Sequence, residues 1–166
     1  FERWNDGELQ SYLIQITAKA LAQKDPETGR PIVELIQDKA GQKGTGQWTL
    51  INAAEQAVVI STINAAVEAR VLSSQKPLRL LAATRLQGPV PAAGSLGLDA
   101  AAREALVAQV HDALYASKIV SYAQGMALMR HMSDLKGWAL DLGAIAAIWR
   151  GGCIIRARFL NRITEA

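Results

Sequence analysis

The stretch DAAAREALVAQVHDALYASKIVSYAQGMALMRHM, residues 99–132, decides the fold class of this chain. Its apolar residues recur every three or four positions rather than every second one, and it is rich in alanine, the strongest helix former. Asp99 can cap the first turn, because the first backbone N–H groups of a helix have no partner within the helix. We predict one long helix here, with five residues facing inward: Leu106, Val110, Leu114, Ile119 and Leu128.

The same spacing continues on both sides of this stretch. It predicts a helix that ends before Asp25, a short helix at 32–38 for which a strand is the alternative, and further helices at 47–58, 61–74, 77–86, 138–149 and 153–166. Residues 88–97 read as a loop, because prolines and glycines gather there. We therefore predict an all-α, multi-helix fold, a single helical domain over residues 1–166, with no Rossmann sheet in this span.

The first helix is expected to begin near Asn5 or Asp6. Glu8 stands three residues after Asn5, the spacing of a capping box. The buried face of this helix would carry four residues at helical spacing: Leu9, Leu13, Ile16 and Ala20.

Composition and charge exclude several classes of protein. The 166 residues carry 18 Lys plus Arg against 15 Asp plus Glu, a net charge of +3, which permits an anionic ligand without indicating nucleic acid. Apolar runs are far shorter than the roughly 18 to 20 residues of a membrane span, so we expect no membrane partner. One cysteine, Cys153, and two distant histidines support no metal site, and the scarcity of cysteine favours the cytoplasm.

A glycine-rich loop is the most informative local feature. In GQKGTG, residues 41–46, glycines allow close backbone approach, a helix start follows, and Lys43 and Thr45 add a cation and a hydroxyl. Gln47 and Trp48 stand where a nucleotide P-loop needs Lys and Ser or Thr, so no P-loop is present. Arg70 is a second cation, among small residues that leave room for a ligand. These residues fit an anion site, although a plain capped loop and a surface arginine remain alternatives.

A second cationic region lies near the C-terminus. Arg150, Arg156, Arg158 and Arg162 could form a face that binds nucleic acid or a protein partner. The region lacks interleaved aromatic residues, and such faces are more often solvated or paired with acids. A helical interaction or nucleic-acid-binding module that uses this Arg150 to Arg162 face is the alternative function.

Six blocks of sequence, in order, resemble the helical domain of decarboxylating 6-phosphogluconate dehydrogenases. They are FERWNDGEL (1–9), SYLI (11–14), GQKGTGQWT (41–49), the pairs around 69–73, LYASKI with SYAQG (114–125), and IWRGGCIIR (148–156). The resemblance extends from end to end except for 87–98. It implies an NADP-dependent oxidative decarboxylation of 6-phosphogluconate to ribulose 5-phosphate and CO2 in the pentose phosphate pathway.

The resemblance also implies residue roles. Lys43 and Arg70 would bind the substrate phosphate, with Thr45 assisting, and the domain would contribute surface to a homodimer. Gln47 departs from the family, which often carries a lysine there. The family's catalytic acid and base, and most of its NADP site, precede the position of Phe1. We therefore assign no catalytic residue here, and we expect this segment alone to be inactive and prone to association.

Overall fold

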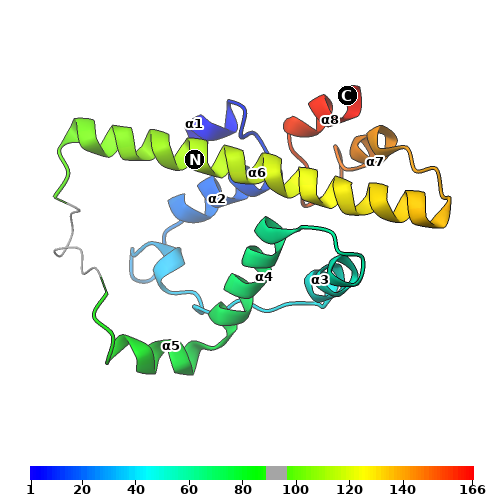
Figure 1. Cartoon of the computed structure of the whole chain (residues 1–166). Helices are drawn as coiled ribbons and strands as arrows, with labels where there is room; N and C mark the ends of the chain where they lie inside the picture. The colour runs from blue at the N-terminus through cyan, green and yellow to red at the C-terminus, as the bar shows by residue number, and fades with distance from the viewer. Residues whose placement is uncertain (89–96) are drawn as a thin grey trace. The chain divides into compact units, whose positions relative to one another are not determined.

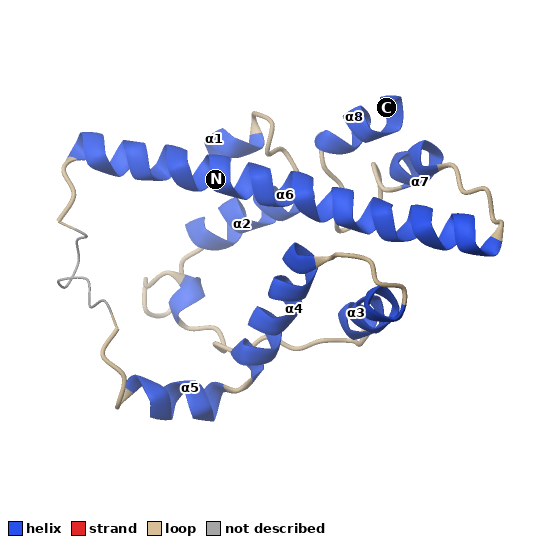
Figure 2. Cartoon of the chain, viewed as in Figure 1, coloured by secondary structure: helices blue, strands red, loops and turns tan. Residues whose placement is uncertain are grey.

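The computed structural model describes residues 1–88 and 97–166, and its ordered elements are helices (Figure 2). In these ranges there are eight α-helices and one 3₁₀ helix, with two isolated bridges but no strand. The predicted all-α fold is confirmed. Most of the predicted loop at 88–97 lies outside the described residues.

Figure 1 shows the described elements in chain order. They are α1 (Glu2–Asn5), α2 (Tyr12–Ala22), the 3₁₀ helix (Ile32–Glu34), α3 (Thr45–Glu55), α4 (Ser61–Ser74), α5 (Lys76–Ala83), α6 (Ala100–Lys136), α7 (Leu142–Ile148) and α8 (Phe159–Glu165). They group into two compact units. Unit 1 is made of residues 1–37 and 126–166, and unit 2 of residues 38–125.

Helix α6 confirms the long helix predicted from the sequence. The Asp99 carboxylate accepts a hydrogen bond of 2.7 Å from Ala102 N–H, and Gly137 follows the last turn at a φ of 66°. The predicted inward face is wrong for four of its five residues. Leu128 is buried, but Leu106, Val110, Leu114 and Ile119 are 36 to 50% exposed. The periodicity identified the helix, but it could not show how much of it the rest of this chain covers.

The start of the first long helix was predicted wrongly. Asn5 ends the short α1, its side chain accepts from Ser11 N–H, and α2 starts only at Tyr12. Ser11 Oγ, rather than a box of Asn5 and Glu8, caps α2 by accepting from Ile14 N–H. Ile14 is accordingly the buried residue of α2, whereas Leu13, Ile16 and Ala20 are exposed; Leu9 is fully buried in the turn before the helix.

Other helix limits shift for local reasons. Residues 32–38 form only a single 3₁₀ turn, Ile32–Glu34. The segments 138–149 and 153–166 are helical only over α7 and α8. Asp141 caps α7 through a 2.9 Å bond from Ala144 N–H, and Ala139 before it has a left-handed φ of 52°, so the helix cannot start earlier. The prediction for 61–74 matches α4, while α3 begins two residues before the predicted start and ends at Glu55.

Unit 1 has a small core around α7 and α8. Leu9, Ala146 and Leu160 are completely buried. Backbone bonds join distant segments of this unit: Tyr12 N–H donates to Arg156 O, and Arg158 N–H donates to Gln10 O, each at 2.9 Å. The start of α2 and the residues just before it are thereby fixed to the C-terminal segment.

Unit 2 positions α4 with very little apolar burial. Its buried residues include Ala53 of α3 and Ile60, which precedes α4, but α4 itself contains no buried residue. Several large apolar side chains of the unit are exposed, among them Trp48, Val59 and Leu72. Hydrogen bonds from other segments to both ends of α4 therefore contribute to its positioning.

Candidate functional site

The glycine-rich loop forms a turn into α3. Gly44 has a φ of +99°, a left-handed conformation that other residues rarely adopt, and it directly precedes the helix. A Cβ on Gly44 would lie 3.6 Å from the Trp48 ring, so this ring packs over the turn. Trp48 N–H donates to Gly44 O at 3.0 Å, which closes the first turn of α3.

The start of α3 presents unused hydrogen-bond donors. Gly44 has no side chain to cap the helix, and in the described part of the chain the backbone N–H groups of residues 45–47 have no acceptor. Lys43 and Thr45 are exposed at this point, and Lys43 forms no ion pair with any described residue. A helix N-terminus with a lysine beside it favours an anion, because the free N–H groups carry partial positive charge and the lysine adds a full positive charge.

Arg70 lies on α4 and is exposed, also without an ion pair among the described residues. Ser73 follows it by three positions and thus shares its side of the helix. Ser73 Oγ accepts a 3.1 Å bond from Ala40 N–H, just before the loop. The sequence suggested that small residues such as Ser73 leave room for a ligand, whereas the structure uses its hydroxyl to hold the loop.

A second contact fixes the other end of the loop. A Cβ on Gly46 would come within 2.8 Å of Val67 Cγ2, so α3 approaches α4 closely at this residue. The loop between Ala40 and Gly46 is therefore attached at both ends to the part of α4 between Ser73 and Val67, which rises about 9 Å over six residues. Lys43 is the midpoint of the first segment and Arg70 the midpoint of the second. The structure thus joins the segments that carry the two predicted cations at both of their ends.

Further polar ties hold these segments. The Arg79 guanidinium of α5 binds Asp38 and the Ser73 carbonyl, and its hydrogen bond to Asp38 lowers the pKa of that carboxyl group. At the opposite end of α4, the Gln124 side chain accepts from Thr62 N–H at 3.0 Å and Ile63 N–H at 3.3 Å. Sequence reasoning missed both residues, because each binds a partner distant in the sequence: Arg79 binds Asp38 across 41 residues, and Gln124 binds Thr62 across 62.

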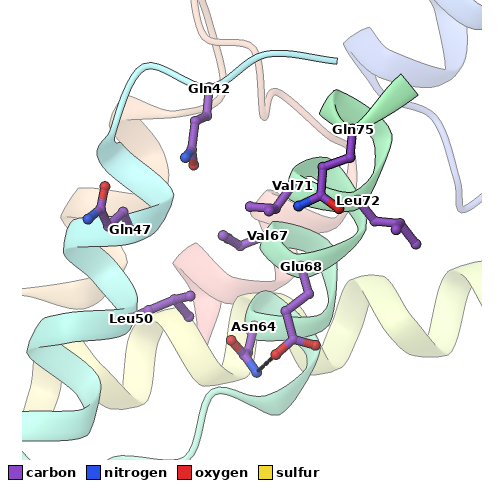
Figure 3. A pocket seen from close by; sticks show the side chains of 9 residues that line it. All are labelled: Gln42, Gln47, Leu50, Asn64, Val67, Glu68, Val71, Leu72 and Gln75. Atoms are coloured by element: carbon purple, nitrogen blue, oxygen red, sulfur yellow. Dashed lines mark hydrogen bonds between the residues drawn. The ribbon is translucent and has the colours of Figure 1, made fainter. Parts of the chain in front are cut away.

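A pocket of about 500 Å³ opens between α3 and α4 (Figure 3). Four aliphatic side chains, four amides and one carboxylate line it: Leu50, Val67, Val71, Leu72, Gln42, Gln47, Asn64, Gln75 and Glu68. Asn64 donates to Glu68 at 2.9 Å within the pocket wall. Lys43, Thr45 and Arg70 are not part of this lining, and a carboxylate opposes a phosphate. The pocket is therefore not the candidate anion site.

Three of the four C-terminal arginines have side-chain contacts within unit 1, and the fourth, Arg158, is exposed. Arg156 donates to Gln15 at 3.1 Å, and its guanidinium lies 5.9 Å from the centre of the Tyr12 ring. Arg162 pairs with Glu8 at 3.0 Å. Arg150 donates to the Ala147 carbonyl and to Asn161. These contacts favour the structural interpretation of this region over the alternative function.

The described ranges contain neither a metal-binding cluster nor a membrane-spanning helix. No three His, Cys, Asp or Glu side chains there are grouped so that they could hold a metal ion. No helix there is both long enough and apolar enough to span a bilayer.

Comparison with known proteins gives a consistent result. A 6-phosphogluconate dehydrogenase of Plasmodium falciparum, solved in its apo form, with NADP+ and with 6-phosphogluconate, superposes with a TM-score of 0.86 and 43% identity, over 99% of this chain and 34% of that one. A decarboxylating 6-phosphogluconate dehydrogenase of Synechococcus elongatus is 52% identical over all of this chain and 35% of its own length. Two enzymes of Bacillus subtilis, named NAD(+)-dependent and NADP(+)-dependent, are each 48% identical over all of this chain and 34% of their own lengths.

These matches define the class as the helical domain of a sugar-phosphate dehydrogenase. The model of the family described as 6-phosphogluconate dehydrogenase, C-terminal domain, matches residues 1–166. The chain belongs to this family, and the resemblance found in the sequence is confirmed. It spans about a third of the length of the curated relatives it matches.

Proposed function

We propose that this chain is the substrate-phosphate-binding part of a decarboxylating 6-phosphogluconate dehydrogenase. The full-length enzyme would oxidise 6-phosphogluconate with NADP and release ribulose 5-phosphate and CO2. Family membership supports the reaction. The observation that supports the role of this chain is the attachment of the Lys43 loop to the segment of α4 that carries Arg70. A hydrogen bond from Ala40 to Ser73 fixes one end of the loop, and the close packing of Gly46 against Val67 fixes the other.

The chemistry of these residues suits a phosphate. Lys43 and Arg70 supply two cations, Thr45 supplies a hydroxyl, and the start of α3 supplies backbone N–H groups. Arginine can donate two parallel bonds to phosphate oxygens, and lysine acts as a compact charge. Phosphate contacts far from the reacting carbons provide binding energy that positions C1 and C3 of the substrate for reaction elsewhere in the enzyme.

The nicotinamide cofactor is proposed to bind mainly outside this chain. A Rossmann cradle needs a strand, a glycine-rich turn and a helix, and the described ranges contain no strand. The residues present therefore do not fit this group. The equal identity to an NAD(+)-dependent and an NADP(+)-dependent relative agrees with cofactor preference being set by other residues of the enzyme.

The full-length enzyme is further proposed to be a homodimer and to act in the cytoplasm. Exposed apolar side chains on α6, such as Val110 and Val120, offer surface that a second subunit could cover. The single cysteine suits a reducing compartment.

The proposal is tested with the full-length enzyme. NADP reduction is followed at varied 6-phosphogluconate for the wild type, Lys43→Ala and Arg70→Ala, with Arg162→Ala as a control from unit 1. Both site variants are expected to lose substrate affinity, while the control keeps the wild-type Michaelis constant. Unchanged constants in both site variants would refute the phosphate assignment, and no activity in a folded wild type would refute the reaction.

A further inference from the structure

We propose that Arg79 is a positioning residue of the anion site: it fixes the segment leading to Lys43 against the end of the helix that carries Arg70. This inference rests on the proposed phosphate-binding role of those two cations. It concerns what sets their separation, because both are exposed on segments with little apolar burial.

The Arg79 guanidinium joins two segments that are far apart in sequence. One terminal nitrogen donates to the Asp38 carboxylate at 2.9 Å, and the other donates to the Asp38 carbonyl at 2.7 Å and to the Ser73 carbonyl at 3.1 Å. Asp38 lies two residues before Ala40, whose N–H bonds Ser73 Oγ. The segment before the loop is therefore attached to Ser73 in two ways. Ala40 binds the Ser73 hydroxyl directly, and Asp38 is linked to the Ser73 carbonyl through Arg79.

The site of attachment on α4 is favourable for a cation. Ser73 is the penultimate residue of α4, where carbonyl groups lack partners within the helix and the helix dipole is negative. Ser73 also follows Arg70 by three residues, less than one turn. A displacement of this end of α4 would therefore move Arg70 directly.

Arg79 is suited to hold the site rather than to bind the phosphate itself. Its terminal nitrogens are already occupied, and the Asp38 carboxylate offsets its charge. Its Nε atom is buried and has no hydrogen-bond partner among the described residues, so this edge of the group faces protein rather than solvent. Lysine cannot replace the group, because an ammonium on a flexible stem cannot reproduce the planar fork.

The test uses the full-length enzyme with inorganic phosphate as a competitive probe. Arg79→Lys is expected to raise the Michaelis constant for 6-phosphogluconate and the inhibition constant of phosphate about tenfold each, with kcat changed far less. Arg30→Lys is the matched control, because Arg30 forms an exposed ion pair with Glu34 in unit 1. Its constants should equal those of the wild type.

A milder variant guards against loss of folding. Ser73→Ala removes only the hydroxyl that accepts from Ala40 N–H and should raise both constants a few-fold, roughly the value of one hydrogen bond. Arg79→Lys or Ser73→Ala with a folded enzyme and unchanged constants for substrate and phosphate would overturn the proposal.

A double-mutant comparison separates this proposal from the proposed function. In the Lys43→Ala/Arg70→Ala enzyme, Arg79→Lys should change kcat/KM by less than about twofold, since the groups it positions are gone. A full tenfold loss in that background would overturn the positioning role. If Lys43→Ala and Arg70→Ala themselves leave kcat/KM unchanged, the phosphate assignment fails; if they lower it and Arg79→Lys does not, only the inference about Arg79 fails.

Discussion

Two cationic regions of this chain look alike in sequence and differ in structure. Three C-terminal arginines have contacts within unit 1: Arg150, Arg156 and Arg162. Arg162 pairs with an acid, Arg150 donates to a carbonyl and an amide, and Arg156 donates to an amide and lies near an aromatic ring. Lys43 and Arg70 in unit 2 make no such contact with the described residues, although their segments are tied together at both ends. Charge density alone did not separate structural arginines from candidate ligands; the partner of each side chain did.

The two units differ in which residues make the polar contacts that hold their segments together. In unit 1 the guanidinium groups themselves form the ties. In unit 2 the ties are made by neighbouring residues, Ser73 and Arg79, which leaves Lys43 and Arg70 available for an anion. Substitutions in the two regions should therefore affect different quantities, stability in the first and substrate affinity in the second.

The largest effect is expected at Lys43 and Arg70. Arg70→Ala and Lys43→Ala should each lower kcat/KM for 6-phosphogluconate by about 10- to 100-fold, the value of a charge-assisted hydrogen bond. Thermal unfolding should change little, because neither side chain is buried or paired in the described structure. Steady-state kinetics and calorimetry on the same preparations check both statements, and a large loss of stability would remove the distinction between the regions.

The close contact of α3 with α4 should give the next largest effect. Gly46→Ala places a methyl group 2.8 Å from Val67 Cγ2, so the Val67 side chain or the helices must shift, at a cost of about 1 to 3 kcal/mol. The Michaelis constant for 6-phosphogluconate should rise as well. Gly151→Ala is the control, since no atom lies within 4 Å of its added methyl group. Equal behaviour of the two variants in denaturant unfolding and kinetics would show that this contact does not shape the site.

Arg156 should behave in the opposite way to Arg70. Arg156→Met loses the bond to Gln15 and the contact with the Tyr12 ring, and it should lower the free energy of unfolding by about 1 to 2 kcal/mol. The Michaelis constant should stay at the wild-type value. Chemical denaturation gives the first quantity, and a strongly raised Michaelis constant would mean that the C-terminal arginines also serve the substrate.

The exposed pair of Arg162 and Glu8 should matter less. Their side chains are 62% and 42% exposed, so Arg162→Ala is expected to cost at most about 1 kcal/mol and to leave kinetics unchanged. The difference in unfolding free energy between the wild type and Arg162→Ala should shrink as salt is raised, because salt screens such a pair. A loss that persists at high salt would argue for a role beyond the ion pair.

Acid should weaken the Asp38 tie by a small amount. Arg79 lowers the pKa of Asp38 in the folded chain, so the stabilisation is fully present above the unfolded pKa of about 4 and is lost as pH falls through the lower folded pKa. Asp38→Asn lacks this proton-linked contribution. The difference in melting temperature between wild type and variant should therefore shrink on acidification from neutral pH to below pH 3.8, the ordinary value for this group. A difference that grows in acid would contradict the assignment.

Local spacing allowed prediction of the long helix, α4 and the cationic loop, because those features depend on residues within a few turns of one another. The ties that arrange the site could not be predicted in this way. Ala40 meets Ser73 across 33 residues, Arg79 meets Asp38 across 41, and Gln124 meets Thr62 across 62. Serine, arginine and glutamine at these positions are equally compatible with exposed surface until the helices are placed.

The most direct test of the central claim compares two substrates that differ only in the phosphate. For the full-length enzyme, kcat/KM is measured with 6-phosphogluconate and with gluconate, in the wild type and in Arg70→Ala. If Arg70 binds the phosphate, the substitution should lower the value for 6-phosphogluconate by about 10- to 100-fold and leave that for gluconate unchanged. Equal losses with both substrates, or no loss with either, would contradict the claim.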